Sequence, residues 1–334
     1  MLPVVSFLAA VAISYGVLLW LRPLLARYAL AKPNVRSSHK VPTPQGGGIA
    51  VVAATVVVGM AAAIAAAAQS VELTRLAIVF ASAVGLAIVG AIDDVRPLDP
   101  LPRLAIQTVA VAAVIAALPG DVKAVPQLSW WLDRAVLLVG GVWLVNAVNF
   151  MDGIDWMTVA EIVPVTGLIA LFGGLMNALP PAATLAAACL CGAMIGFAPF
   201  NRPVARLFLG DVGSLPVGLL LGWLLAMLAG QGHLAAAILL PLYYVADATI
   251  TLLRRLLGGE RITQAHRSHF YQRALDGGLT VFRIVTAVFA VNIALGALAL
   301  LTITSPSRST HVAALAAGAI LVGGLLVYFN RVRN

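Results

Sequence analysis

Residues 47–68 read GGIAVVAATVVVGMAAAIAAAA, a run of 22 residues without a charged side chain. A helix crosses the hydrocarbon core of a bilayer with about 20 predominantly apolar residues. The run does not alternate between apolar and polar residues, and it is rich in alanine, which argues against a transmembrane β-strand. This stretch therefore predicts a membrane-spanning α-helix.

The rest of the chain has the same character. Of 334 residues, 61% are hydrophobic and 10% are charged. A water-soluble fold cannot bury that much apolar surface. We therefore predict one integral-membrane domain over residues 1–334, an all-α bundle of about eleven transmembrane helices. The predicted spans are about 3–22, 47–68, 76–92, 104–119, 135–150, 158–178, 183–199, 214–230, 234–253, 282–304 and 311–329.

The basic residues predict the orientation of the bundle. With the N-terminus outside, the segments facing the cytoplasm hold 17 of the 21 Lys and Arg residues. Such a bias is typical of cytoplasmic loops, so we expect the C-terminus in the cytoplasm. The net charge of +8 is spread over successive loops and does not form a basic domain, which argues against a nucleic-acid partner.

The acidic and other polar residues gather in five inter-span segments that face the predicted cytoplasmic side. These candidate active-site loops are about 24–46, 93–103, 150–157, 200–213 and 254–281. Because all five share one face of the membrane, we expect their side chains to form a single site.

The first segment is SSHKVPTPQGGGIA, Ser37–Ala50. Lys40 precedes three glycines at the entrance of a helix, where backbone N–H groups and the helix N-terminus favour an anion such as phosphate. The alternative is a flexible loop before a span.

The second segment is GAIDDVRPLDPLPRLAIQ, Gly90–Gln107. Adjacent carboxylates repel each other unless a cation is bound, so Asp93 and Asp94 indicate Mg²⁺ or Mn²⁺, or a base beside a metal. Arg103 would then pair with a phosphate or with these acids. A solvated acidic loop is the alternative.

The third segment is NAVNFMDGIDWMTVA, Asn146–Ala160. Asn149, Asp152 and Asp155 are spaced i, i+3, i+6, which places them roughly on one face if the helix continues. An asparagine with two acids suits a metal site or a contact to a sugar or nucleobase.

The fourth segment is FNRPVARLFLGDVGSLPVG, Phe200–Gly218. Asp211 lies between glycines, where a carboxylate on a tight turn can reach a metal ion. Asn201 and Phe208 are candidates for base recognition, although a lone phenylalanine is more often a packing residue.

The fifth segment is AHRSHFYQRALDGG, Ala265–Gly278. His266 and His269 can face the same way on a helical turn, and with Arg267 they suit a diphosphate better than zinc, which would need further ligands. Asp247 lies inside a predicted span, where an acid is functional by default. It would either neutralise Arg254 or orient another group.

Five such motifs, in this order and on one face, resemble the polyprenyl-phosphate N-acetylhexosamine-1-phosphate transferases of glycosyltransferase family 4. The resemblance covers about Ser37 to Arg273 and depends on NFMDGID, GDVGS and AHRSH in combination. It implies transfer of an N-acetylated hexosamine 1-phosphate from a UDP-sugar to undecaprenyl phosphate, with release of UMP. It also implies a multi-pass protein of the bacterial cytoplasmic membrane, Mg²⁺ or Mn²⁺ as cofactor, and a homodimer.

The resemblance assigns roles to the residues of these motifs. The implied metal ligands are Asp211, Asp93 and Asp94. The implied catalytic residues are Asp93, Asp94, Asp152, His266 and His269. The residues implied around the UDP-sugar and its phosphates are Lys40, Asn149, Asp155, Asn201, Phe208, Arg103 and Arg267.

Within the family, HRSH is more similar to the branch that initiates O-antigen synthesis, the WbpL, WbcO and WecA type. The peptidoglycan branch, MraY, carries three adjacent histidines at this point. Trp156 replaces a glycine that the family commonly has after DGID. Two other hypotheses stay open: a phospho-MurNAc-pentapeptide transferase, and an ion-coupled transporter with Asp247 and Glu161 as intramembrane ion sites. The sequence does not identify the sugar.

Overall fold

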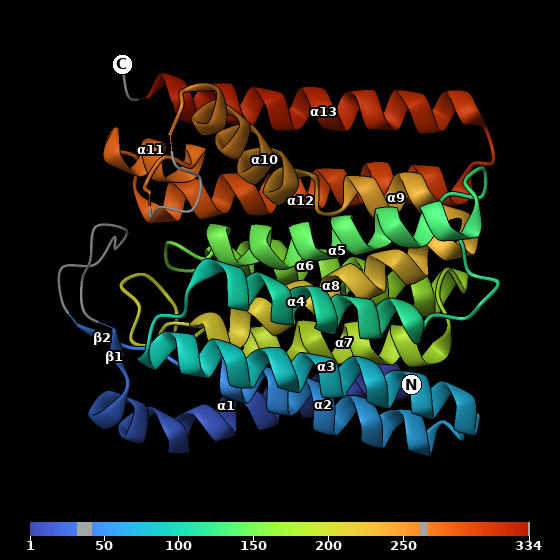
Figure 1. The fold of residues 1–334 in the computed structure, drawn as a ribbon, viewed down its shortest axis with the longest axis horizontal. Coiled ribbons are helices and arrows are strands. Elements are labelled where there is room, and N and C mark those ends of the chain that lie inside the picture. The colour runs from blue at the N-terminus through green and yellow to red at the C-terminus, as the bar shows by residue number, and fades with distance from the viewer. Residues whose placement is uncertain (32–41, 261–265, 333–334) are drawn as a thin grey trace.

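A computed structural model describes residues 1–31, 42–260 and 266–332 as a bundle of long helices (Figure 1). The structure is 78% helical. Strands β1 (Leu30–Ala31) and β2 (Thr43–Pro44) pair antiparallel at one end of the bundle. The helices are α1 (Leu2–Tyr28), α2 (Gly48–Ala65), α3 (Ser70–Val95), α4 (Pro100–Ala116), α5 (Trp130–Met151), α6 (Met157–Met176), α7 (Pro181–Phe197), α8 (Asp211–Leu228), η1 (Ala229–His233), α9 (Leu234–Leu239), α10 (Leu242–Leu257), α11 (Phe270–Asp276), α12 (Val281–Thr304) and α13 (Arg308–Arg331).

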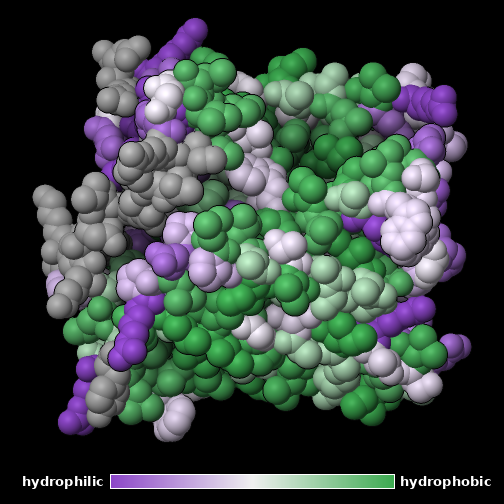
Figure 2. Space-filling view, viewed as in Figure 1, coloured by the Kyte–Doolittle hydropathy of each residue, from purple (hydrophilic) through white to green (hydrophobic). Residues whose placement is uncertain are grey.

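Among the described residues, eight helical segments are long and apolar enough to cross a membrane. They are α1, α2, α3, α5, α6, the segment from α8 through α9, α12 and α13, while α4 and α7 are shorter apolar helices. Figure 2 shows a largely hydrophobic surface between two ends at which hydrophilic residues gather. The two termini lie at opposite ends of the bundle (Figure 1). These features are those of a polytopic membrane protein, for which eleven passes and an outside N-terminus stay predictions.

The structure divides the predicted span 234–253. Gly232, with φ 92°, interrupts the helix after α8, and Figure 1 shows α9 leading from there back toward α10. Helix α9 has only six residues, and α10 begins after Pro241. Proline has no N–H group and ends a helix that precedes it. The predicted span is therefore two short helices joined at a break.

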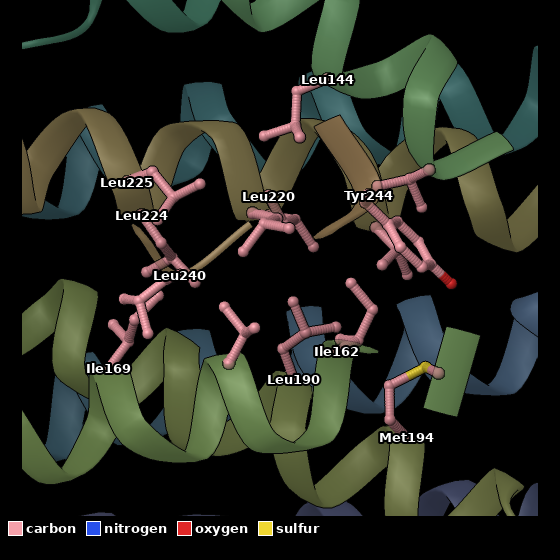
Figure 3. Close-up of a cluster of buried hydrophobic side chains, with 14 of the residues drawn as sticks. Leu144, Ile162, Ile169, Leu190, Met194, Leu220, Leu224, Leu225, Leu240 and Tyr244 are labelled. Atoms are coloured by element: carbon pink, nitrogen blue, oxygen red, sulfur yellow. The ribbon is translucent and has the colours of Figure 1, made fainter. Parts of the chain in front are cut away.

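Helix α8 is the centre of the bundle and is buried almost throughout. Its Leu220, Leu224 and Leu225 meet side chains of α5, α6, α7 and α10 (Figure 3). Lipid tails are as apolar as leucine, so helices in a membrane associate through close packing and hydrogen bonds more than through burial. Small residues at helix contacts are therefore important in this fold.

Two glycines allow neighbouring helices to approach the first turn of α8. A Cβ atom at Gly48 of α2 would collide with the backbone of Gly213. A Cβ atom at Gly90 of α3 would collide with the backbone of Asp211. The second contact brings the last turn of α3, with its two aspartates, against the start of α8.

Candidate active site

A cavity of about 1040 Å³ lies at the end of the bundle that carries β1, β2 and α11. Thirteen residues are assigned roles in the site on the basis of the sequence, and eleven of them line this one cavity. They are Asp93, Asp94, Arg103, Asn149, Asp152, Asp155, Asn201, Phe208, Asp211, His266 and His269. Of the other two, Lys40 lies outside the described residues and Arg267 does not line the cavity.

Two carboxylates and one guanidinium group form the acidic centre of the cavity. Arg103 Nη1 lies 2.8 Å from Asp93 Oδ2 and 3.5 Å from Asp211 Oδ2. The backbone N–H of Leu98 donates to Asp93 Oδ1 at 2.6 Å. Residues from α3, α4 and α8 thus meet at one point, as we expected when we predicted that their loops share one face.

Asp94 has different contacts from Asp93. Its carboxylate accepts the backbone N–H groups of Asp211 at 2.9 Å and Val212 at 3.2 Å, which lack partners within α8. Gly210, with φ 76°, makes this approach possible, because a side chain there would press on the Asp94 carboxylate. Asp94 therefore anchors the start of α8, whereas Asp93 faces Arg103. The metal and catalytic roles assigned to Asp94 stay predictions.

Asn149 and Asp152 lie at the end of α5. Asn149 Nδ2 donates to Asp211 Oδ1 at 2.7 Å and to Ser214 Oγ at 2.9 Å. Asp152 accepts a hydrogen bond from Thr158 Oγ1 at 2.5 Å. Burial raises the pKa of Asp152 to about 7, and the nearby Asp94 and Asp155 charges add to this, while the Thr158 hydrogen bond opposes it. Asp152 can therefore exchange a proton near neutral pH.

The loop after α5 is tied to the loop after α7. Asp155 Oδ2 accepts the N–H of Ala205 at 2.9 Å. Asn201 accepts the N–H of Trp156 through Oδ1 at 2.7 Å and donates through Nδ2 to the carbonyl of Leu207 at 3.0 Å. Both ends of the Asn201 amide thus hold backbone groups, so its base-recognition role stays a prediction. Phe208, on the same loop, lines the cavity.

Trp156 has φ 60°, a region that favours glycine. This explains in physical terms why a glycine would be suitable at the position. The indole Nε1 donates to the carbonyl of Ala198 at 2.7 Å, which joins the two loops a second time. Trp156 is not among the residues that line the cavity. Its two hydrogen bonds are with Asn201 and Ala198, which belong to the neighbouring loop.

Residues 266–269, which we call the histidine segment, contribute His266 and His269 to the cavity lining. The rings of His266 and His269 are 5.0 Å apart, and His266 Nδ1 lies 2.9 Å from Ser268 Oγ. His269 is buried, with Nδ1 3.1 Å from Asp247 Oδ1. Arg267 pairs with Asp276 at 2.9 Å. Both histidines therefore line the cavity, whereas Arg267 does not and is paired with Asp276; its expected contact to a phosphate stays a prediction.

For the glycine-rich segment the structure corrects the expected role of two glycines, while the role of Lys40 stays a prediction. The N–H groups of Gly47 and Gly48 donate to the carbonyls of Phe208 and Leu209, both at 2.9 Å. These N–H groups are therefore not available to a phosphate. Gly47 and Gly48 instead let the start of α2 lie directly against Phe208 of the loop before α8 and against Gly213 of α8.

An apolar arm of the cavity was not predicted. It is lined by Leu104 of α4, by Leu138, Val139, Val142 and Trp143 of α5, and by Ala248 and Leu252 of α10. Val139 is 71% exposed and Leu104 43%, so the arm reaches the apolar outer surface. Its residues recur at helical spacing, a pattern that does not distinguish a groove from a packed core. The cavity is thus lined by charged side chains in one part and by apolar side chains in another.

The charged end fits a magnesium ion. Within residues 1–31, 42–260 and 266–332, no three His, Cys, Asp or Glu side chains form a metal-binding group. Magnesium is usually bound by one or two carboxylates together with substrate phosphates and water. Asp93 and Asp211, close enough to share one guanidinium group, provide such a pair of oxygen donors.

Comparisons with known proteins show which family the chain resembles in sequence. Residues 76–229 match the family "Glycosyl transferase family 4". The chain is 31% identical to a decaprenyl-phosphate N-acetylglucosaminephosphotransferase of Mycolicibacterium smegmatis, over 84% of this chain and 77% of that protein. It is 25% identical to a probable undecaprenyl-phosphate N-acetylglucosaminyl 1-phosphate transferase of Bacillus subtilis, over 86% and 82%. It is 30% identical to a phospho-N-acetylmuramoyl-pentapeptide-transferase of Streptococcus pneumoniae, over 71% and 76%.

Proposed function

The chain belongs to glycosyl transferase family 4, and we propose that it transfers N-acetylglucosamine 1-phosphate from a UDP-sugar to a polyprenyl phosphate, releasing UMP. The single observation that carries the proposal is the cavity, in which an acidic and cationic end is continuous with an apolar arm. Such a shape suits two substrates that both carry phosphate, one of which also has a long hydrocarbon tail.

The charges of the substrates determine what the site must supply. A nucleotide diphosphate and a lipid phosphate are both anionic and repel each other, so their approach requires cationic groups. Arg103, His266 and His269 line the cavity at the charged end. We propose that Asp93 and Asp211 hold Mg²⁺ or Mn²⁺ there, where the ion would neutralise charge that develops on the phosphoryl oxygens.

In the proposed reaction an oxygen of the lipid phosphate attacks the β-phosphorus of the donor. The bond from that phosphorus to the bridging oxygen breaks, and UMP leaves with the oxygen. Because no bond to the sugar carbon breaks, the anomeric configuration is retained. A two-step route through an aspartyl phosphate on Asp93 or Asp94 is the alternative. Exchange of labelled UMP into the UDP-sugar, measured without acceptor lipid, occurs only in the two-step route.

The residues around the acidic centre position the donor. Asn149 holds Asp211 through its hydrogen bond. Phe208 presents an aromatic ring to the cavity, which suits stacking of the uracil base. Asp155 and Asn201 hold the loop that carries Phe208. Asp152 also lines the cavity and is close enough to Asp94 and Asp155 for their charges to raise its pKa.

The apolar arm is the proposed site of the acceptor lipid. The broken segment between α9 and α10 places α10 beside α5, where Trp143 Nε1 donates to Thr249 Oγ1 at 3.0 Å. Because apolar side chains of α4, α5 and α10 line the same cavity as Asp93 and Asp211, we propose that these helices leave an apolar channel from the membrane to the acidic centre. A polyprenyl chain in this channel would present its phosphate to Asp93, Arg103 and Asp211.

The other hypotheses receive less support. The peptidoglycan-type relative aligns over a smaller share of this chain than the N-acetylglucosamine-type relatives. A transporter would depend on Glu161 and Asp247 as ion sites. Glu161 accepts a hydrogen bond from Asn292 Nδ2 at 2.7 Å, and Asp247 accepts hydrogen bonds from several donors.

We propose a multi-pass protein of the bacterial cytoplasmic membrane with its site on the cytoplasmic side. A homodimer and a role in O-antigen synthesis stay predictions.

The proposal is tested by UMP release from the full chain in detergent micelles. The reaction contains undecaprenyl or decaprenyl phosphate, MgCl₂ and one of a panel of UDP-sugars, with UDP-N-acetylglucosamine first. We expect UMP release that requires both the lipid and the metal and that stops with EDTA. UMP release only with UDP-MurNAc-pentapeptide would support the peptidoglycan alternative. No release with any UDP-sugar would overturn the proposal.

A further inference from the structure

Asp247 of α10 is fully buried, and five donors converge on its carboxylate. Oδ1 accepts from His269 Nδ1 at 3.1 Å, from the N–H of Phe270 at 3.1 Å and from Thr251 Oγ1 at 3.2 Å. Oδ2 accepts from the N–H of Tyr271 and from the Tyr243 hydroxyl, both at 3.4 Å. Three of these donors belong to the segment that starts α11.

The position of Asp247 therefore selects one of the two roles that the sequence left open. Three of its five hydrogen bonds are with residues 269–271 and the other two are with its own helix. Arg254 instead donates to the carbonyl of Ser268 and lies over the ring of Phe270. A buried carboxylate without partners would be costly, and hydrogen bonds from several donors remove that cost. The donors found here indicate that Asp247 holds the segment from His269 to Tyr271 in place.

The contact with His269 also determines which ring nitrogen carries hydrogen. An ionised carboxylate is only an acceptor, so the imidazole must donate from Nδ1. In a neutral imidazole the other nitrogen, Nε2, is then an acceptor, and in an imidazolium it is a second donor. His269 lines the cavity, and its Nδ1 is the nitrogen that faces Asp247. Nε2 is thus the ring nitrogen left for a group in the cavity.

Neighbouring rings restrict the imidazole further. The ring of Tyr271 stacks on that of His269 with centroids 5.8 Å apart, and Phe150 lies at 6.4 Å. Tyr271 itself donates through its hydroxyl to the carbonyl of Phe150 at 3.2 Å. The imidazole is therefore held on its Nδ1 edge by Asp247 and beside its faces by aromatic rings.

We propose that Asp247 is a positioning residue of the transferase: it binds Nδ1–H of His269, holds the start of α11, and thereby presents Nε2 of His269 to the donor diphosphate. This inference rests on the proposed function for the identity of the group that Nε2 meets. It does not rest on that function for the tautomer or for the geometry. A carboxylate that orients an imidazole in this way is a recurrent arrangement in enzymes and metal sites.

The proposal predicts that Asp247 acts on turnover only through His269. We compare four variants in the UMP-release assay: Asp247→Ala, Asp247→Asn, His269→Gln, and the double variant Asp247→Ala with His269→Gln. We expect Asp247→Ala to lower kcat by about 10- to 100-fold, the range typical for removal of a group that orients a ligand. We expect the double variant to lose no more than His269→Gln alone, because the two residues act as a unit. Multiplicative losses would overturn the proposal.

Two controls separate positioning from stability. Tyr243→Phe removes another donor to Asp247 but leaves His269 Nδ1 in contact, so it should lower the thermal stability in detergent without lowering kcat. Asp247→Asn keeps one acceptor oxygen for the start of α11, so it should fold even if Asp247→Ala does not. It should lose less kcat than the alanine variant. If Tyr243→Phe and Asp247→Asn lowered kcat equally, a purely structural role would be indicated.

A spectroscopic measurement tests the tautomer without any substrate. In protein labelled with ¹⁵N-histidine, the signals missing from His269→Gln identify His269. At high pH, where the ring is neutral, we expect hydrogen on Nδ1 in the wild type and loss of that preference in Asp247→Ala. Hydrogen on Nε2 in the wild type would overturn the inference. Absence of UMP release with every donor would instead overturn the proposed function, and the ¹⁵N result would still decide the role of Asp247.

Discussion

Asn149 on α5 holds the carboxylate of Asp211 on α8, with Nδ2 2.7 Å from Oδ1. The same amide nitrogen donates to Ser214 Oγ at 2.9 Å, one turn further along α8. Because Oδ1 is bound in this way, Oδ2 is the oxygen that Asp211 turns toward Arg103. The contact thus fixes the direction in which Asp211 can offer an oxygen to a metal ion.

Asn149→Ala should lower kcat by about 10- to 100-fold, because Asp211 loses the group that orients it. Ser214→Ala is the matched control, since it removes the other partner of the same amide and leaves the Asp211 contact intact. We expect Ser214→Ala to remain within a few-fold of wild type. Equal losses for both variants would show that the packing of α5 on α8 matters and that the Asp211 contact does not.

Asp93→Asn and Asp211→Asn should each lower the rate of UMP release by several orders of magnitude, while the protein stays folded in detergent. Each change removes one of the two oxygen donors proposed for the metal and keeps the shape of the side chain. Asp99→Asn is the control, because Asp99 belongs to the same segment but is exposed and does not line the cavity. Wild-type rates for Asp93→Asn or Asp211→Asn would contradict the assignment of the site.

Arg103→Gln should change the metal and donor requirements in opposite directions. Removing the guanidinium group leaves the negative charge of Asp93 and Asp211 uncompensated, so these carboxylates should attract the metal ion more strongly. Half-maximal activity should therefore need a lower Mg²⁺ concentration. The anionic UDP-sugar loses an attractive charge, so its KM should rise. Both constants are read from UMP release at varied metal and donor concentrations. A rise in the Mg²⁺ requirement would show that Arg103 does not compete with the ion for these carboxylates.

Thr158→Val should move the pH dependence of kcat toward higher pH. The pKa of Asp152 is raised to about 7 by burial, and the Thr158 hydrogen bond is the contact that opposes this shift. Removing the hydroxyl raises the pKa further. If turnover needs ionised Asp152, activity rises with pH through the pKa, and the variant should lose more activity at pH 7 than at pH 9.

Thr166→Val is the control for that change, because Thr166 is also buried on α6 but donates to the carbonyl of Ile162 within its own helix. Its pH profile should match the wild type. If kcat of Thr158→Val fell on acidification at the same pH as kcat of the wild type, a role for ionised Asp152 in turnover would be contradicted.

Trp156→Gly should raise the KM for the UDP-sugar with a smaller effect on kcat. Glycine keeps the backbone N–H that Asn201 accepts and is suited to φ 60°, but it loses the indole contact to Ala198. The loop that carries Phe208 should then be less well held. Trp156→Phe loses the same hydrogen bond but keeps the bulk of the ring, so comparison of the two variants separates the bond from the packing. A change in which UDP-sugar is preferred would instead indicate direct contact with the sugar.

The meeting of Asp93, Arg103, Asn149 and Asp211 could be predicted from the sequence because membrane topology restricts the problem. Alternate loops lie on the same side, so polar segments an even number of spans apart must share a face. The distances within the site and the separate contacts of Asp94 could not be predicted. They depend on how closely α3 approaches α8 at Gly90, which only the folded chain shows.

The role of the glycines, the helix break at Pro241 and the partner of Asp247 could not be predicted from the sequence. The glycines at positions 46–48 have the composition of an anion-binding loop, but close packing of backbones also requires glycine. The break at Pro241 lies within a continuous apolar stretch, so hydropathy alone joined α9 and α10. Asp247 could be identified as unusual inside a span, yet its partner His269 lies 22 residues further along the chain, beyond any helical repeat.

The central claim is that the sugar and its phosphate are transferred together to a lipid. We would incubate the full chain in detergent with UDP-N-acetylglucosamine labelled with ³²P at the β-phosphate, undecaprenyl phosphate and MgCl₂, and then separate lipid from water. We predict that the label enters the lipid phase in equal amount to the UMP that is released, and that Asp211→Asn abolishes both. Release of UDP, with the label left in water, would contradict the account.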